Sequence, residues 1–283
     1  MNEESNKTNT SLIKSARKGL FVANKALSFT NKLAGGEVQR YFNEAFCLLN
    51  GFTENENNYL FNLQNRKNYR KNYPFSFIAK NFDDYAEAKK LFTKVIELKP
   101  DHYLAYDFRG IARVKMGDIS GGILDFGLSS IYNSKYQYAF LNCGNAYDDK
   151  GDFRKAIENY DAAIALDKEF AQAYNARGNC RSKIKNHKDA LLDYNQAILI
   201  DPEYAVAYYN RGITYKHLKN LEASMEDYNK AIDLNPNFAH AFNGRGNVKT
   251  ILGDSSAAGK DFESAAKNDK NFASYYKTLG TKY

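Results

Sequence analysis

One glycine recurs every 34 residues through the last two thirds of this 283-residue chain. An aromatic residue stands four residues before each of these glycines, and a small residue stands twelve residues after each of the first five. A second aromatic follows four residues after the small one. The glycines are Gly110, Gly144, Gly178, Gly212, Gly246 and Gly280. A period of this length predicts supersecondary units that stack on one another to bury their apolar faces.

The spacing inside one unit predicts two antiparallel helices. Small residues let two helix axes come close, and aromatic residues at helical spacing fill the space between neighbouring pairs. Between the two halves of every unit stands an Asp or Asn, which fits a turn or a helix N-cap. These residues are Asp118, Asp152, Asn186, Asn220 and Asp254. The chain is therefore expected to be all-α.

The combined pattern resembles the tetratricopeptide repeat family. It consists of aromatic-x-x-x-Gly, then small-x-x-x-aromatic-x-x-Ala, with Pro202 and Pro236 closing two units. The resemblance implies a right-handed superhelical α-solenoid of helix-turn-helix repeats over residues 69–283. Five complete repeats, called repeats 1 to 5 below, are expected at 103–136, 137–170, 171–204, 205–238 and 239–272. A degenerate repeat at 69–102, whose first half contains Pro74, precedes them, and a half-repeat at 273–283 follows.

Residues 1–68 lie outside the repeats and form an N-terminal extension. Residues 11–34 have no acidic side chain and predict an amphipathic helix whose polar side carries Lys14, Arg17, Lys18, Lys25 and Lys32. Such a helix packs on the first repeat as a cap, contacts an anionic membrane or targets an organelle, or binds a partner; the sequence leaves these three roles open. A second helix is expected at 37–50, followed by a polar linker. The basic and aromatic stretch 66–73 is either a solvated linker or a short nucleic-acid contact.

Four repeats place an arginine directly before the recurring glycine and an aspartate sixteen residues later. The pairs are Arg109 with Asp125, Arg177 with Asp193, Arg211 with Asp227, and Arg245 with Asp261. In repeat 2 both places are uncharged, Cys143 and Asn159. Because the two places change together, we expect a partly buried ion pair between the two helices of one repeat. This role is structural rather than catalytic.

The resemblance implies that the first helices line a concave face that contacts a partner segment. One side of these helices is rich in amides, which donate and accept hydrogen bonds and so suit the backbone of an extended peptide. The candidate contact residues are Asn142, Asn145, Asn175, Asn179, Tyr209, Asn210, His240, Asn243 and Asn247. In family members that bind chaperone tails, cations surround two such amides. Here the cationic places hold Asn175, His240 and Gly244, so a carboxylate clamp of that kind is not expected.

Catalytic and metal-binding motifs are missing from the sequence. The histidines are scattered, no phosphate-binding Gly-rich loop occurs, and His217 with His240 would lack a carboxylate to complete a metal site. The three cysteines are far apart, which favours a reducing, cytoplasmic environment, with organelle targeting by residues 11–34 left open. No cofactor, metal or small-molecule substrate is expected.

The function expected from the sequence is therefore a non-enzymatic protein–protein interaction scaffold or adaptor. Nucleic-acid binding is not expected, because the net charge of +7 is modest and the repeats are close to neutral. The alternative is a membrane- or organelle-associated assembly subunit docked by residues 11–34. The open C-terminal end also offers a surface for self-association.

Overall fold

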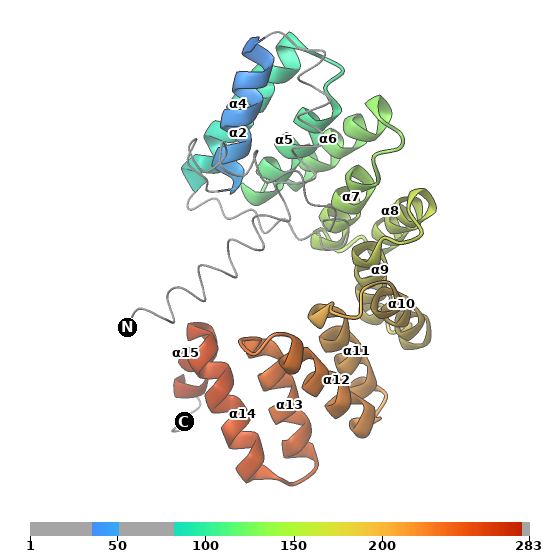
Figure 1. Cartoon of the computed structure of the whole chain (residues 1–283), viewed down its shortest axis with the longest axis vertical. Helices are drawn as coiled ribbons and strands as arrows, with labels where there is room; N and C mark the ends of the chain where they lie inside the picture. Colours follow the sequence, from blue (N-terminus) through green and yellow to red (C-terminus); the bar gives the residue numbers. More distant parts are fainter. Residues whose placement is uncertain (1–35, 51–81, 279–283) are drawn as a thin grey trace. The chain divides into compact units, whose positions relative to one another are not determined.

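The computed structural model describes residues 36–50 and 82–278, and within these ranges it contains thirteen α-helices and no strand. The all-α repeat fold expected from the sequence is confirmed. The chain divides into an N-terminal body, residues 1–166, and a C-terminal body, residues 167–283 (Figure 1). Among the helices of the described ranges, none has the length and apolar character needed to cross a membrane.

The helices follow the predicted repeats. The N-terminal body contains α2 (Gly36–Asn50), α4 (Phe82–Leu98), α5 (Tyr103–Lys115), α6 (Ile119–Tyr132), α7 (Gln137–Asp149) and α8 (Phe153–Leu166). The C-terminal body contains α9 (Ala171–Lys183), α10 (His187–Ile200), α11 (Ala205–His217), α12 (Leu221–Leu234), α13 (Ala239–Ile251), α14 (Ser255–Asn268) and α15 (Lys270–Thr278). Helix α15 begins ahead of the expected position 273, because Asp269 Oδ1 accepts a hydrogen bond from the Asn271 N–H and starts the helix there.

Each complete repeat is a helix pair whose turn and packing follow from a few residues. Asp118 Oδ1 caps α6 by accepting from the Gly121 N–H, and Asn186, Asn220 and Asp254 do the same at α10, α12 and α14. The recurring glycine marks the closest helix approach. A Cβ on Gly110 would lie 2.7 Å from the Phe126 ring, so any side chain there would push the pair apart.

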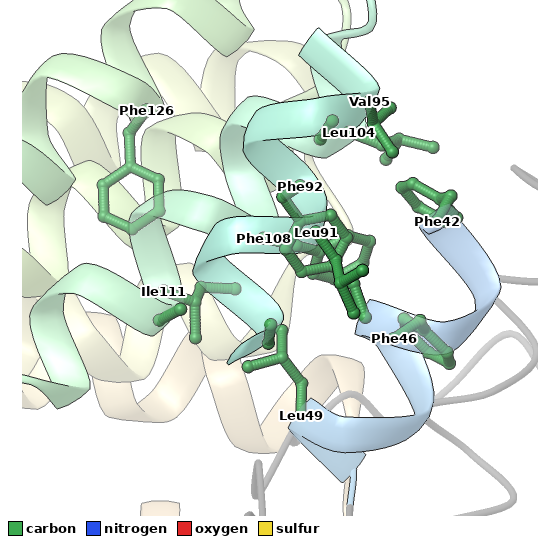
Figure 2. Close-up of a cluster of buried hydrophobic side chains, with 14 of the residues drawn as sticks. Phe42, Phe46, Leu49, Leu91, Phe92, Val95, Leu104, Phe108, Ile111 and Phe126 are labelled. Carbon is green, nitrogen blue, oxygen red and sulfur yellow. The ribbon is translucent and has the colours of Figure 1, made fainter. Parts of the chain in front are cut away.

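Helix α2 packs against α4 in the way the first helix of a repeat packs against the second. Figure 2 shows Phe42, Phe46 and Leu49 pointing from α2 into the core formed with α4 and α5. The Phe42 and Phe92 rings lie 5.5 Å apart, and those of Phe46 and Phe108 lie 5.3 Å apart. The described helix that pairs with α4 therefore comes from the N-terminal extension. The first half of the degenerate repeat, expected at 69–81, lies outside the described residues.

Several other expectations also fall outside the described residues. These are the basic helix at 11–34 with its five cations, the stretch 66–73, and the last five residues of the half-repeat. They stay predictions.

Candidate partner-binding face

The arginine and aspartate of each expected pair form a salt bridge. In repeat 4, Arg211 Nε and Nη2 donate to the two carboxylate oxygens of Asp227 at 2.8 and 2.6 Å. Repeats 1, 3 and 5 contain the same bridge, between Arg109 and Asp125 at 2.7 Å, Arg177 and Asp193 at 2.6 Å, and Arg245 and Asp261 at 2.6 Å. The aspartates are buried, and burial raises the pKa of Asp227 although Arg211 opposes the shift. The pair therefore braces the two helices of a repeat.

The same arginines also reach the preceding repeat, a contact that the sequence reasoning missed. Arg211 Nη1 donates to Asn195 Oδ1 at 2.7 Å, and Arg245 Nη1 donates to Asn229 Oδ1 at 2.8 Å. In the N-terminal body, Arg109 Nη1 donates to Thr93 Oγ1 at 3.3 Å. Each acceptor stands sixteen residues before its arginine, so the signal was present in the sequence.

Two of the candidate amides belong to hydrogen bonds between neighbouring first helices. In the N-terminal body, Asn142 Nδ2 donates to both carboxylate oxygens of Asp107, at 3.0 and 3.2 Å. In the C-terminal body, Asn210 Nδ2 donates to Asn175 Oδ1 at 3.0 Å. Asn175 is only 6% exposed, and its Nδ2 also donates to the Tyr204 hydroxyl at 3.4 Å. With both ends of its amide bonded inside the chain, Asn175 is part of the scaffold, and we remove it from the contact set.

Three further asparagines are oriented by tyrosine hydroxyls. Tyr160 donates to Asn145 Oδ1 at 2.8 Å, Tyr194 to Asn179 Oδ1 at 2.8 Å, and Tyr276 to Asn243 Oδ1 at 2.6 Å. The oxygen of each amide is occupied, so its Nδ2 group is the part left for a partner, and none of the described residues accepts a hydrogen bond from it. The three amides therefore present donors rather than an even mixture of donors and acceptors.

In the C-terminal body, an aromatic row lies on the first-helix side. Tyr209 packs against Phe238 and His240, with ring centroids 5.0 and 6.2 Å away. His240 in turn lies 5.1 Å from Phe272. The row is only partly covered, since His240 is exposed and Tyr209, Phe238 and Phe272 are half-buried. We call these four rings, together with Asn179, Asn243 and Asn247, the first-helix face.

The structure does not pair His217 with His240, the two histidines considered together in the sequence analysis. His240 belongs to the aromatic row, whereas the ring of His217 stacks on that of His187 at 5.6 Å and 7°. Spacing along adjacent first helices suggested His217 and His240, but His187 comes from the start of a second helix. No group of three His, Cys, Asp or Glu side chains suited to a metal occurs in the described ranges.

In the N-terminal body, the carboxyl group with the most strongly shifted pKa is that of Asp107 on α5. Its side chain is fully buried, and burial raises its pKa to about 7, while hydrogen bonds from Asn142 and Tyr136 oppose the rise. The Tyr136 hydroxyl donates to it at 3.3 Å. With Tyr136 and Asn142 around it and no room for substrate, this carboxyl serves the contact between repeats.

Comparison with known proteins identifies the repeats. Models described as "Tetratricopeptide repeat" match residues 171–204, 205–238 and 75–102, and one described as "TPR repeat" matches 144–184. No curated protein matches the chain. Arrays of this repeat are generally non-enzymatic scaffolds for protein–protein interaction, and the matching repeats support a scaffold role for this chain.

Solved structures of similar fold agree. A crystal structure of MamA is 27% identical, with a TM-score of 0.51, and the match covers 59% of this chain and 97% of that one. The APC/C hetero-tetramer Cut9–Hcn1 is 17% identical over 71% of this chain and 40% of that one, with a TM-score of 0.61. A tetratricopeptide repeat protein from Parabacteroides merdae is 18% identical over 69% and 77%, with a TM-score of 0.58. With its period, helix pairs and matching repeats, the chain is a tetratricopeptide-repeat protein.

Proposed function

We propose that the first-helix face of the C-terminal body binds an extended segment of a partner protein, so that the chain acts as a scaffold or adaptor. The observation that carries this proposal is the partly covered aromatic row of Tyr209, Phe238, His240 and Phe272. Rings of this kind give a large contact area for apolar side chains at little cost in side-chain entropy.

Hydrogen-bond polarity supports an extended backbone as the ligand. Tyrosine hydroxyls donate to the oxygens of Asn179 and Asn243, both half-buried, and none of the described residues accepts a hydrogen bond from their Nδ2 groups. Asn247 stands four residues after Asn243 on α13 and is half-buried. Amide donors match the carbonyl groups of a peptide that runs in extended conformation, whereas a carboxylate tail would need the cations that this face lacks.

The test is affinity capture with the full-length chain, comparing wild type with Asn247→Ala/His240→Ala. Neither side chain makes a hydrogen bond to another residue within 36–50 or 82–278, so the fold is expected to persist, as circular dichroism would verify. We expect partners of the wild type to be lost or reduced at least about tenfold. The matched control is Glu226→Ala/Lys230→Ala on the exposed side of α12, which should capture partners as the wild type does. Equal capture by the Asn247/His240 variant would move the binding site off this face.

The alternative, docking of an assembly subunit through residues 11–34, concerns residues outside the described ranges, and no contact of the described helices favours it.

A further inference from the structure

The turns within repeats 3 and 4 have an unusual backbone. In the other three turns, the residue after the C-cap of the first helix is a glycine with positive φ: Gly117 at 87°, Gly151 at 81° and Gly253 at 86°. Repeats 3 and 4 instead have Lys185 at 64° and Lys219 at 60°. Glycine adopts this conformation without steric penalty, whereas a lysine is strained in it. Two successive repeats therefore keep lysine where glycine suits the fold better, and strain of this kind points to a role outside the fold.

More cations surround these two lysines. Lys185 and Lys188 lie around the first turn, and Lys216 and Lys219 around the second. The nearby acids are Asp189, whose carboxylate accepts a hydrogen bond from the Asn186 amide at 2.8 Å, and the exposed Glu222. Positive charge is thus in excess at this edge of the C-terminal body.

Contacts between the repeats bring the two turns together. The stacked rings of His187 and His217 join the start of α10 to the end of α11. Partial burial lowers the pKa of His217, and Lys216 and His187 lower it further. The first helices α9, α11 and α13 are in contact in sequence order, so their C-terminal ends and the turns that follow line one edge (Figure 1).

Exposed aliphatic side chains stand beside these lysines. Ile184, Leu218 and Leu252 are the C-caps of the three first helices, spaced 34 residues apart, and are 49%, 47% and 59% exposed. Apolar side chains that face solvent at the same place in three successive turns contribute little to the core. Aliphatic groups interspersed with lysines are typical of surfaces that lie on anionic lipid. We call these three residues and the four lysines, Lys185, Lys188, Lys216 and Lys219, the turn edge.

We propose that the turn edge is a peripheral binding surface for an anionic lipid membrane. The lysines attract the negatively charged headgroups, and Ile184, Leu218 and Leu252 enter the interface between headgroups and acyl chains. The turn edge shares no residue with the first-helix face, and the proposal does not depend on partner binding there.

The residue types at the turn edge favour lipid over two other anions. Residues 183–188 and 216–219 contain no Tyr, Phe or Trp, the side chains on which single-stranded bases stack. Acidic or phosphorylated groups of a protein partner are bound best by the planar guanidinium of arginine. The neighbouring arginine, Arg181, donates to Asp193 at 2.9 Å and is committed to the scaffold. Lysine ammonium groups act as point charges, which suits the diffuse charge of a lipid surface.

Vesicle co-sedimentation of the full-length chain tests the proposal. We expect binding to phosphatidylcholine vesicles that contain phosphatidylserine, weaker binding at higher salt, and none to phosphatidylcholine alone. The variant Lys185→Gly/Lys219→Gly should bind roughly thirtyfold more weakly, because each lysine near an anionic surface contributes about one kcal/mol. Its melting temperature should rise, because glycine relieves the strain at both turns. Weaker binding by a more stable protein cannot be ascribed to unfolding.

Two controls complete the experiment. Lys230→Ala/Lys267→Ala removes the same charge from exposed positions on α12 and α14 and should leave vesicle binding close to wild type. All variants are also measured with the five cations of residues 11–34 changed to Gln, which removes the positive charge of that segment; these are Lys14, Arg17, Lys18, Lys25 and Lys32. The proposal is overturned if the Lys185/Lys219 variant binds these vesicles as the wild type does. It is also overturned if those lysines are needed for binding polyglutamate but not vesicles, which would identify an acidic protein as the partner.

Discussion

Single residues decide whether a polar side chain on the first helices serves the scaffold or a partner. The fifth position of the first helix is polar in repeats 1, 3 and 5, and in repeats 1 and 3 this residue, Asp107 or Asn175, accepts from the asparagine 35 residues later. Each also bonds the tyrosine 29 residues later, Tyr136 or Tyr204. In the other three repeats the aromatic 29 residues later is a phenylalanine, which needs no hydrogen-bond partner. The fifth position there is Leu141, Tyr209 or Asn243, and Asn243 accepts from Tyr276 instead.

Asp107 makes the contact between repeats 1 and 2 dependent on pH. Its pKa is raised by burial to about 7 in the folded chain, above the usual range of an unfolded aspartate. Between about pH 4 and about pH 7 the folded state therefore holds more protons than the unfolded state, and stability falls as pH rises through this window. Asp107→Asn should abolish this dependence and raise the free energy of unfolding above pH 7 by on the order of 4 kcal/mol. Urea unfolding across the pH range measures both effects.

The equivalent position supplies the matched control for this prediction. Asn175→Asp places a carboxyl in the same surroundings in repeat 3, and it should destabilise the C-terminal body at neutral pH and recover as pH falls. An unchanged pH profile in Asp107→Asn would show that the carboxyl is charged and well solvated in the native chain.

At the scale of the helix, glycine has two opposite effects in repeat 1. Gly110 lies where α5 meets α6, and a Cβ there would lie 2.7 Å from the Phe126 ring and 3.1 Å from the carbonyl oxygen of Gly122. Gly127 lies inside α6 with no atom within 4 Å of a would-be Cβ. The first glycine sets the distance between two helices, whereas the second only weakens its own helix.

These two glycines should respond to alanine with opposite signs. Gly110→Ala is expected to lower the free energy of unfolding by about 1 to 3 kcal/mol, because the backbone of Gly122 cannot move aside as a flexible side chain would. Gly127→Ala should raise it by up to about 1 kcal/mol, since alanine has the higher helix propensity. Denaturant unfolding of the two variants measures both free energies of unfolding. A decrease of similar size in both variants would contradict the distinct roles assigned to the two glycines.

At the scale of the whole molecule, each repeat buries its apolar surface against its neighbours, and a terminal repeat needs another helix to bury the surface that no neighbour covers. At the N-terminal end, α2 buries Phe42, Phe46 and Leu49 against α4 and α5 (Figure 2). The arginines that bridge from one repeat to the preceding one extend this nearest-neighbour coupling along each body.

Loss of the α2 contact should therefore destabilise the N-terminal body and spare distant helices. Phe46→Ala is expected to cost about 3 to 5 kcal/mol, as for other fully buried phenylalanines. Hydrogen exchange should rise in α4 and α5, while amides of α11 keep their protection. Phe82→Ala, at a phenylalanine that is 59% exposed, is the control and should change stability by less than about 0.5 kcal/mol. Equal effects of the two substitutions would mean that α2 is not part of the core.

The repeat, the helix pairs and the aspartate partners of the repeated arginines could all be predicted from the order of residues along the chain. These features depend on contacts inside one repeat. The 34-residue period gives the length of a repeat, and the joint change to the uncharged Cys143 and Asn159 in repeat 2 indicates that the two places are in contact. The amides were harder to interpret, because a row of asparagines looks the same whether it faces a partner or a neighbouring helix.

The packing of the helices was needed to tell which side chains are already bonded within the chain. It buried Asn175, placed tyrosine hydroxyls on the oxygens of Asn179 and Asn243, brought His187 to His217, and paired α2 with α4. It also showed that Lys185 and Lys219 stand in a glycine conformation. The physical reason is that these features depend on how one helix pair is placed on the next, and on backbone angles at a turn, neither of which helical periodicity specifies.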